Sequence, residues 1–210
     1  MAIRIDTLPL GDLQANCYLL TTSEAQTAVA IDPGGEISPV LATLRHRERK
    51  LTHILLTHGH FDHIGGVADL VEATGAVLAA HPGDVPLLRR GGGALEWGYE
   101  VEACPEPTLL LEQGQTLETE VARLQVLWVP GHTPGHVAFY WPQAQSVFTG
   151  DALFQGSIGR TDLPGGDFDQ LMQSIRESLL TLPDETVVYP GHGPSTTIGE
   201  EKQLNPFLTD

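Results

Sequence analysis

Short apolar runs alternate with turn residues along the chain, and this pattern predicts strands and helices in alternation. Runs rich in branched and aromatic residues favour strands. We expect strands at residues 3–8, 16–21, 27–31, 54–56, 76–80, 124–129, 137–141, 146–148 and 186–189. Apolar residues at helical spacing predict helices that begin near Ser38, Ile64 and Asp167. Because no linker interrupts this series, we expect one α/β domain over residues 1–210.

Two of the expected helices carry signals at their N-termini. Ser38 and Pro39 suit the N-cap and the first helical position. Asp167 is followed three residues later by Gln170, which resembles a capping box. On the helix after Asp167, we expect the inward face to hold Phe168, Leu171, Met172, Ile175 and Leu179.

Residues 81–107 fit neither pattern. They contain the run Gly91-Gly92-Gly93 together with prolines, and such residues predict irregular structure. The segment is either a flap over a functional site or a plain surface loop.

Composition narrows the possible partners. The 210-residue chain is 41% hydrophobic and has a formal net charge of −16. A balance this acidic argues against a nucleic-acid partner, since phosphate binding needs clustered Lys and Arg. We interpret the charge as a solvated acidic surface that favours solubility.

The N-terminus and the cysteines indicate a compartment. We find neither a basic start followed by an apolar region nor an apolar run of about 18 residues, so we expect no signal peptide and no membrane span. Cys17 and Cys104 lie far apart and outside any CxxC pair. We therefore expect two free thiols and a cytoplasmic location.

The densest chemistry lies in the sequence Thr57-His58-Gly59-His60-Phe61-Asp62-His63. An apolar run precedes it and a helical pattern follows it, so it should form a loop between a strand and a helix. His58 and His60 are two residues apart, which suits a loop rather than one helix face. Crowded imidazoles and carboxylates favour a metal ion that gathers them.

Three later apolar runs also end at a candidate ligand: His132, Asp151 and His192. Glycine precedes each of them and allows a tight turn close to an ion. If these strands stop at one edge of a sandwich, they deliver their side chains to one place.

The order HxHxDH, then GH, GD and GH at strand ends, resembles the metallo-β-lactamase superfamily over nearly the whole chain. The resemblance implies a four-layer αββα sandwich with two metal ions at one edge of the two sheets. It implies a first ion held by His58, His60 and His132, a second held by Asp62, His63 and His192, and Asp151 bridging both. Asp62 and Asp151 are the predicted catalytic carboxylates.

This ligand set predicts two divalent ions per chain, for which zinc is our first expectation. Iron and manganese accept the same imidazole and carboxylate ligands, so both stay open. Metal ions lower the pKa of water to about 7, and the resulting hydroxide attacks a carbonyl.

Residues 131–136, 159–162 and 190–194 are most similar to short glyoxalase II-like hydrolases. The resemblance implies a small-molecule thioester substrate such as S-lactoylglutathione. Arg160 could bind a substrate carboxylate, although a surface ion pair is an alternative. The longer enzymes of the family carry an aromatic residue where this chain has Pro194, which argues against tight glutathione recognition.

Other functions remain as alternatives. A persulfide dioxygenase shares the HxHxDH and GRTD features, but uses one iron held by two His and one Asp. A non-enzymatic metal-binding module is less favoured, because the site keeps open positions. We favour β-lactamase activity and RNA processing still less than the metal-binding module. Asp32 either orients a ligand or only forms a turn, and for His136 we favour a loop role over support of a ligand.

Overall fold

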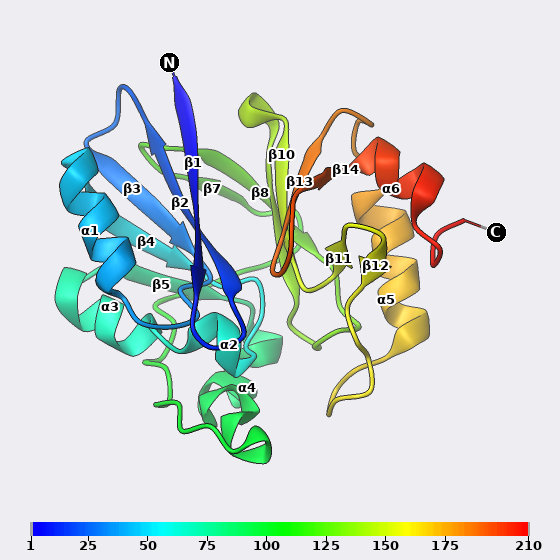
Figure 1. Ribbon diagram of the computed structural model, residues 1–210, viewed down its shortest axis with the longest axis horizontal. Helices are drawn as coiled ribbons and strands as arrows, with labels where there is room; N and C mark the ends of the chain where they lie inside the picture. The colour runs from blue at the N-terminus through cyan, green and yellow to red at the C-terminus, as the bar shows by residue number, and fades with distance from the viewer. Residues whose placement is uncertain (1, 210) are drawn as a thin grey trace.

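Two six-stranded sheets pack face to face in the computed structural model, which describes residues 2–209 (Figure 1). The first has the order β1–β2–β3–β4–β5–β6, with bounds Ile3–Leu10, Ala15–Thr22, Thr27–Ile31, Lys50–Leu55, Val77–Ala80 and Leu109–Leu110. The second has the order β14–β13–β10–β9–β8–β7, with bounds Thr196–Thr197, Val187–Pro190, Ser146–Gly150, Val137–Trp141, Arg123–Trp128 and Thr116–Glu118. A small hairpin joins β11 (Leu153–Phe154) to β12 (Ser157–Ile158).

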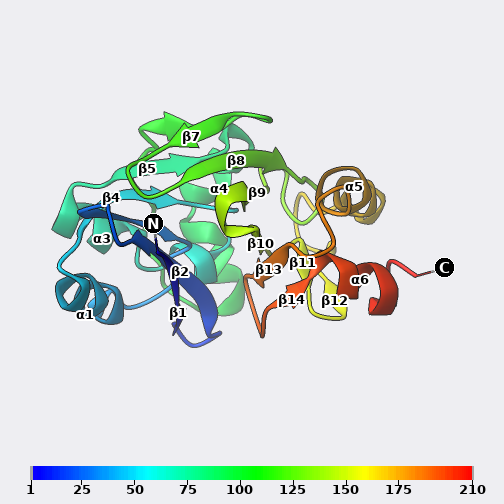
Figure 2. The same ribbon diagram turned by 90° about the horizontal axis from the view of Figure 1, so that it is seen from above.

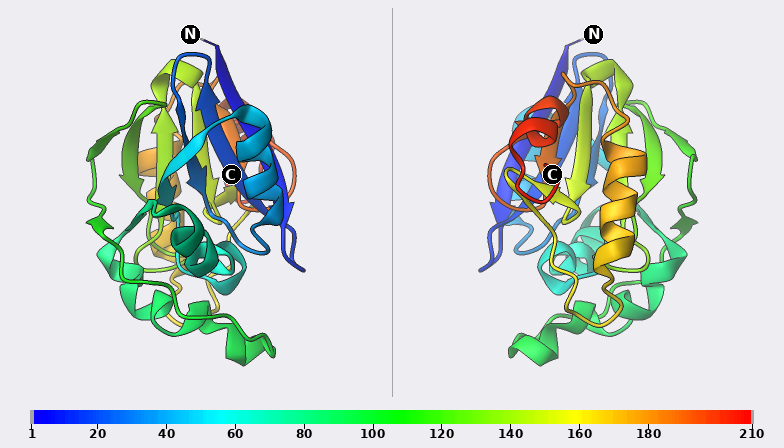
Figure 3. Two further views of the ribbon diagram at one scale, coloured as in Figure 1. Left: turned by 90° about the vertical axis from the view of Figure 1, so that its left-hand side faces the viewer. Right: turned by 90° about the vertical axis from the view of Figure 1, so that its right-hand side faces the viewer.

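Helices cover the outer faces of both sheets. α1 (Ser38–Arg47) and α3 (Val67–Thr74) lie on the first sheet, whereas α5 (Phe168–Ser174) and α6 (Ile198–Leu204) lie on the second (Figures 1 and 3). The predicted four-layer αββα sandwich is therefore confirmed. Short helical segments complete the chain: α2 Phe61–Ile64, α4 Val85–Leu88, 3₁₀ turns at Pro82–Asp84, Gly91–Trp97 and Pro142–Ala144, and a π turn at Ile175–Leu179.

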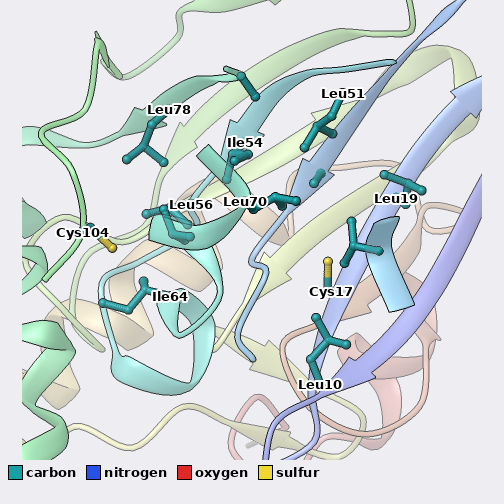
Figure 4. Close-up of a cluster of buried hydrophobic side chains, with 14 of the residues drawn as sticks. Leu10, Cys17, Leu19, Leu51, Ile54, Leu56, Ile64, Leu70, Leu78 and Cys104 are labelled. Atoms are coloured by element: carbon teal, nitrogen blue, oxygen red, sulfur yellow. The ribbon is translucent and has the colours of Figure 1, made fainter. Parts of the chain in front are cut away.

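Three apolar clusters hold the four layers together. Figure 4 shows the first, in which Leu19, Ile54 and Leu70 lie between the first sheet and its helices. The second, between the sheets, contains Phe139 and Phe148, both fully buried. The third packs the second sheet against α5 and α6. Because each sheet is covered on both faces, most of its strands read as continuous apolar runs.

Strand direction decides where the loops gather. β3, β4 and β5 are parallel, so their C-terminal ends share one edge of the first sheet. β10 and β13 are parallel in the second sheet. Viewed from above, the two sheets lie side by side between their helices (Figure 2). The loops after β3, β4, β10 and β13 therefore meet at one end of the sandwich.

Several element boundaries differ from the sequence expectation. The N-cap of α1 is Ile37 rather than Ser38, and its side chain makes no capping bond. Asp167 does cap α5, since its carboxylate accepts a hydrogen bond from Gln170 N at 2.9 Å. Phe168 is 49% exposed and does not face inward, because it lies in the first turn at the surface. Strands β6, β7, β11, β12 and β14 and helices α4 and α6 were not expected.

The helix expected from Ile64 onward is divided at Gly65 and Gly66. Gly66 N donates to Pro33 O at 2.8 Å. A Cβ on Gly66 would lie 2.1 Å from Gly35 O. Close packing against the loop after β3 therefore separates α2 from α3 and requires glycine there.

The structure can be compared with two expectations from the sequence, on the cysteines and on membrane-spanning helices. Cys17 and Cys104 are both free and buried. Among residues 2–209, the structure contains no helix with the length and apolar character needed to cross a membrane.

The sheet–sheet core yields the first prediction. Phe139 is fully buried there, so Phe139→Ala should lower the free energy of unfolding by about 3–5 kcal/mol. Urea unfolding followed by circular dichroism measures this loss. Phe168→Ala makes the same change at a side chain that is 49% exposed, and should cost about 1 kcal/mol or less. Equal losses would contradict this core assignment.

Candidate metal centre

The seven side chains predicted as ligands converge at the end of the sandwich where the strand loops meet. Three imidazoles have nitrogen atoms within 4.8 Å of one another: His58, His60 and His132. A second trio meets the same limit: Asp62, His63 and His192. The sequence pattern thus brings together two ligand sets that are each large enough to hold an ion.

Asp151 lies between the two trios. Its Oδ1 is 3.3 Å from His63 Nε2 in the second trio, and its Oδ2 is 3.8 Å from His132 Nε2 in the first. Oδ2 is also 3.8 Å from His192 Nε2. One carboxylate therefore reaches both trios, as a bridging ligand must.

A buried carboxylate, Asp32, determines which nitrogen of His58 faces the centre. Asp32 accepts hydrogen bonds from Thr57 N at 2.8 Å and from Thr57 Oγ1 at 2.6 Å. Since the hydroxyl proton of Thr57 is used on Asp32, Thr57 Oγ1 can only accept from His58 Nδ1, which lies 3.0 Å away. The lone pair of His58 is thereby placed on Nε2.

The same reasoning applies to two further imidazoles. His63 Nδ1 lies 3.0 Å from Asp32 Oδ2, and His132 Nδ1 lies 2.7 Å from Arg160 O. Both partners are pure acceptors, so each Nδ1 carries a proton, and in the neutral imidazole the lone pair is on Nε2. Metal-binding histidines characteristically have this arrangement.

Buried atoms without a partner test whether a cation fits. Within residues 2–209, His58 Nε2, His63 Nε2 and Asp151 Oδ1 are buried and have no hydrogen-bond partner. The last two face each other at 3.3 Å. A neutral imidazole nitrogen and a carboxylate oxygen in this position repel each other unless a metal ion or a proton lies between them, and leaving them unpaired is costly. The donor set fits a divalent metal.

Charge at the centre supports the same conclusion. Burial lowers the pKa of His60 to about 3, with the neighbouring His132 adding to the effect. Burial also lowers the pKa of His63, but Asp151 and Asp62 outweigh it and raise this pKa well above its usual value. A proton on His63 thus supplies the positive charge that the carboxylates require when no metal ion does.

His136 and Asp32 both support predicted ligands. His136 Nε2 accepts a hydrogen bond from Asp151 N at 3.1 Å, and its ring stacks on that of His58 with centroids 4.9 Å apart. His136 therefore has the loop role that we favoured, since it hydrogen-bonds the backbone of the loop that carries Asp151, and it also packs against the ring of His58. For Asp32, its hydrogen bonds answer the open question in favour of orienting ligands.

Two residues of β2 hold the loop that carries His192, and sequence analysis missed both. Asn16 Nδ2 donates to Pro190 O at 3.1 Å and to Gly193 O at 2.9 Å. Tyr18 Oη donates to Pro190 O at 2.6 Å. The signal in the sequence was Asn16, a polar residue at the start of an apolar strand.

A cavity of about 580 Å³ opens onto the centre. Its floor includes ligand side chains from both trios, and its walls are largely apolar: Leu13, Phe61, Trp97, Tyr99 and Leu163. The rings of Phe61 and Tyr99 stack with centroids 5.0 Å apart. Residues 81–107 supply Trp97 and Tyr99, so this segment walls the cavity and is not a plain surface loop.

Arg160 also lines the cavity, but its guanidinium already has partners. Its Nε and Nη2 each donate to the carboxylate of Asp162 at 2.8 Å, and its Cζ lies 5.2 Å from the centre of the Trp97 ring. The ion pair that the sequence offered as an alternative is present, and it lies at the cavity wall. Binding of a substrate carboxylate by Arg160 stays a prediction.

The chain is similar to a characterised family over most of its length. The sequence profile of the metallo-beta-lactamase superfamily matches residues 10–192. The hydroxyacylglutathione hydrolase GloC of Haemophilus influenzae is 38% identical over 209 residues, which covers 98% of each chain.

Solved structures agree in fold. The crystal structure of BLEG-1 B3 metallo-beta-lactamase superposes with a TM-score of 0.93 and 38% identity, covering 99% of this chain and 100% of that one. TTHA1623, crystallised in a di-iron-bound form, superposes with a TM-score of 0.89 and 48% identity, covering 97% and 100%. The GloC hydrolase and the BLEG-1 β-lactamase are named for different activities. The similarity therefore establishes the family and the fold of this chain, but not its substrate.

Proposed function

Because this chain belongs to the metallo-β-lactamase superfamily, we propose that it is a dinuclear metal-dependent hydrolase that cleaves a thioester. The observation that carries the proposal is Asp151, whose two oxygens reach both ligand trios at the floor of an open cavity. A purely structural metal site would be closed by its own ligands. This centre instead faces a space large enough for a substrate.

We assign the first ion to His58, His60 and His132, the second ion to Asp62, His63 and His192, and the bridging role to Asp151. Neutral imidazoles and carboxylates suit zinc, which we favour, while iron is supported by the di-iron form of a similar protein. Manganese accepts the same ligands.

When bound, such ions lower the pKa of water to about 7 and polarise a carbonyl oxygen. The chain itself keeps Asp151 ionised, since His63 and His132 lower the pKa of this carboxyl well below its usual value despite burial. The pKa of Asp62 is also lowered, by His63 and by the hydrogen bond from His192, although burial opposes the shift. Both catalytic carboxylates therefore stay negative at neutral pH.

The apolar wall indicates how a substrate is held. Phe61, Tyr99 and Trp97 offer contact area to an acyl chain or to the methylene groups of a thiol. A relative is named for hydroxyacylglutathione hydrolysis, so S-lactoylglutathione is our first candidate substrate. The free, buried thiols support our inference of a reducing cytoplasm.

A persulfide dioxygenase is the alternative, and the composition of one trio favours it. Asp62, His63 and His192 are one set of one Asp and two His among the converging side chains, and that enzyme holds its single iron with ligands of this kind. A single iron held by three such ligands would leave four of the seven converging side chains without a metal ion. We therefore prefer the hydrolase.

The proposed activity is tested with and without oxygen. Zinc-loaded protein should cleave S-lactoylglutathione at the same rate under strict anaerobiosis as in air, because water attack on a carbonyl needs no oxidant. Thiol release measures the hydrolysis, and an oxygen electrode with glutathione persulfide measures the competing reaction. Oxygen uptake that rivals the hydrolysis rate would overturn the proposal. Nitrocefin cleavage at a comparable rate would instead point to a β-lactamase.

The metal count is the second test. Fully active protein should contain two ions per chain by elemental analysis, and Asp151→Ala should lose or mispair them because the bridging carboxylate is gone. We expect activity to fall by several orders of magnitude. A single ion in fully active protein would rule out the dinuclear mechanism.

Arg160 gives a prediction about substrate binding. Arg160→Ala should raise KM for a glutathione thioester about tenfold, the lower end of a charge-assisted contact, because Asp162 competes for the guanidinium. A smaller change in kcat is expected if the contact is equal in ground and transition states.

The matched control for Arg160 is Arg89→Ala. Arg89 forms the same two-pronged ion pair, with Glu106, but does not line the cavity. Its replacement should leave KM unchanged. If the two variants behave alike, Arg160 has no role in substrate binding.

A further inference from the structure

Asp84 is a buried carboxylate that sequence analysis did not single out. It lies at the end of the 3₁₀ turn Pro82–Asp84 after β5, with 1% of its surface exposed. Its Oδ2 accepts hydrogen bonds from Gly59 N at 2.9 Å and from Thr133 Oγ1 at 2.7 Å. Its Oδ1 accepts from Gly135 N at 2.7 Å. All three partners donate, so the position requires an acceptor on both oxygens.

These donors belong to the two loops that carry the first trio. Gly59 stands between His58 and His60 in the loop after β4, which belongs to the first sheet. Thr133 and Gly135 follow His132 in the loop between β8 and β9, which belongs to the second sheet. Asp84 therefore ties together two ligand loops that come from different layers of the fold.

The approach is closest on the side of Gly135. A Cβ on Gly135 would lie 2.4 Å from Asp84 N and 2.7 Å from Asp84 Oδ1. A Cβ on Gly59 would lie 3.4 Å from Asp84 Cβ, which is ordinary van der Waals contact. Gly135 thus leaves the space that Asp84 occupies, which allows the carboxylate to reach the backbone of the loop after β8.

We propose that Asp84 is a positioning residue that sets the distance between His60 and His132 and thereby the affinity of the first trio for its metal ion. His60 Nδ1 lies 2.9 Å from His132 Nε2, a separation that depends on the relative placement of the two loops. Asp84 makes no hydrogen bond to the second trio, in which His63 is oriented by Asp32 instead. The inference rests on the proposed ligand assignment, and it predicts that a change at Asp84 affects the binding of one ion only.

Asp84→Asn is the informative variant, because it keeps the shape of the side chain. An amide offers one acceptor oxygen, so its NH₂ group must face either Gly135 N or the pair of Gly59 N and Thr133 Oγ1. Either orientation sets a donor against a backbone N–H that now has no acceptor. The tie between the loops is lost without a change in side-chain volume.

The experiment is calorimetric titration of metal-stripped protein with Zn²⁺. In the Asp84→Asn variant, one binding step should weaken about 10- to 100-fold, as expected when a group that orients ligands is removed. The other step should stay as in the unmodified chain. Excess Zn²⁺ should restore most of the thioester hydrolysis, since no ligand has been removed.

Glu201→Gln is the matched control. Glu201, on helix α6, is 2% exposed and also accepts three hydrogen bonds, from Gly156 N, Thr196 Oγ1 and Asn205 Nδ2. None of these donors lies in the two loops that carry the first trio. Both variants should lower the thermal midpoint. Only Asp84→Asn should weaken metal binding.

Two results would overturn the proposal: Zn²⁺ affinities in Asp84→Asn equal to those of the unmodified chain, or the same weakening in Glu201→Gln. If Asp84→Asn does not fold, Thr133→Val removes one of the three donors at constant shape and should weaken the same step severalfold. An unmodified chain that binds one ion would end the dinuclear proposal. If Asp84→Asn lowers the affinity for that single ion, the result would still support the role of Asp84.

Discussion

The hydrogen bonds of Asp32 are the interaction on which the rest of the centre depends. This carboxylate uses the only proton of the Thr57 hydroxyl, and so fixes the proton of His58 on Nδ1. It also holds His63 by Nδ1. Two imidazoles, one from each trio, are therefore held by Nδ1, and Asp151 adds a negative charge 3.3 Å from Nε2 of His63. The resulting surplus of buried acceptors is stable only with a cation or a proton among them.

The two sheets approach each other through apolar side chains, and such contacts do not fix distances between individual atoms well enough for metal coordination. Directional contacts at the end of the sandwich perform that task. Asp84 joins the loops after β4 and β8. Asn16 and Tyr18 join β2 to the loop after β13. Each of these groups is buried, so its hydrogen bonds are protected from competition with water.

The substrate side of the centre is built from less regular chain. Residues 81–107 contribute Trp97 and Tyr99 to the cavity wall, and the same segment holds Asp84 beneath the ligands. One stretch without regular periodicity thus serves both the geometry of the ligands and the surface that meets a substrate. Arg160 does likewise, because its carbonyl orients His132 while its guanidinium lies at the cavity wall.

Local sequence determined the longer strands, helices α1 and α5 and the seven candidate ligands, because apolar periodicity and motifs at the ends of apolar runs are properties of neighbouring residues. It also determined the cap at Asp167. Only the tertiary structure decided that Gly65 and Gly66 divide a helix, since the cause is packing against the loop after β3. The same holds for Asp84, which is 25 residues from Gly59 and 51 from Gly135 in the chain. A hydrogen bond between distant segments leaves no periodic trace in a single sequence, whereas the burial of an apolar face does.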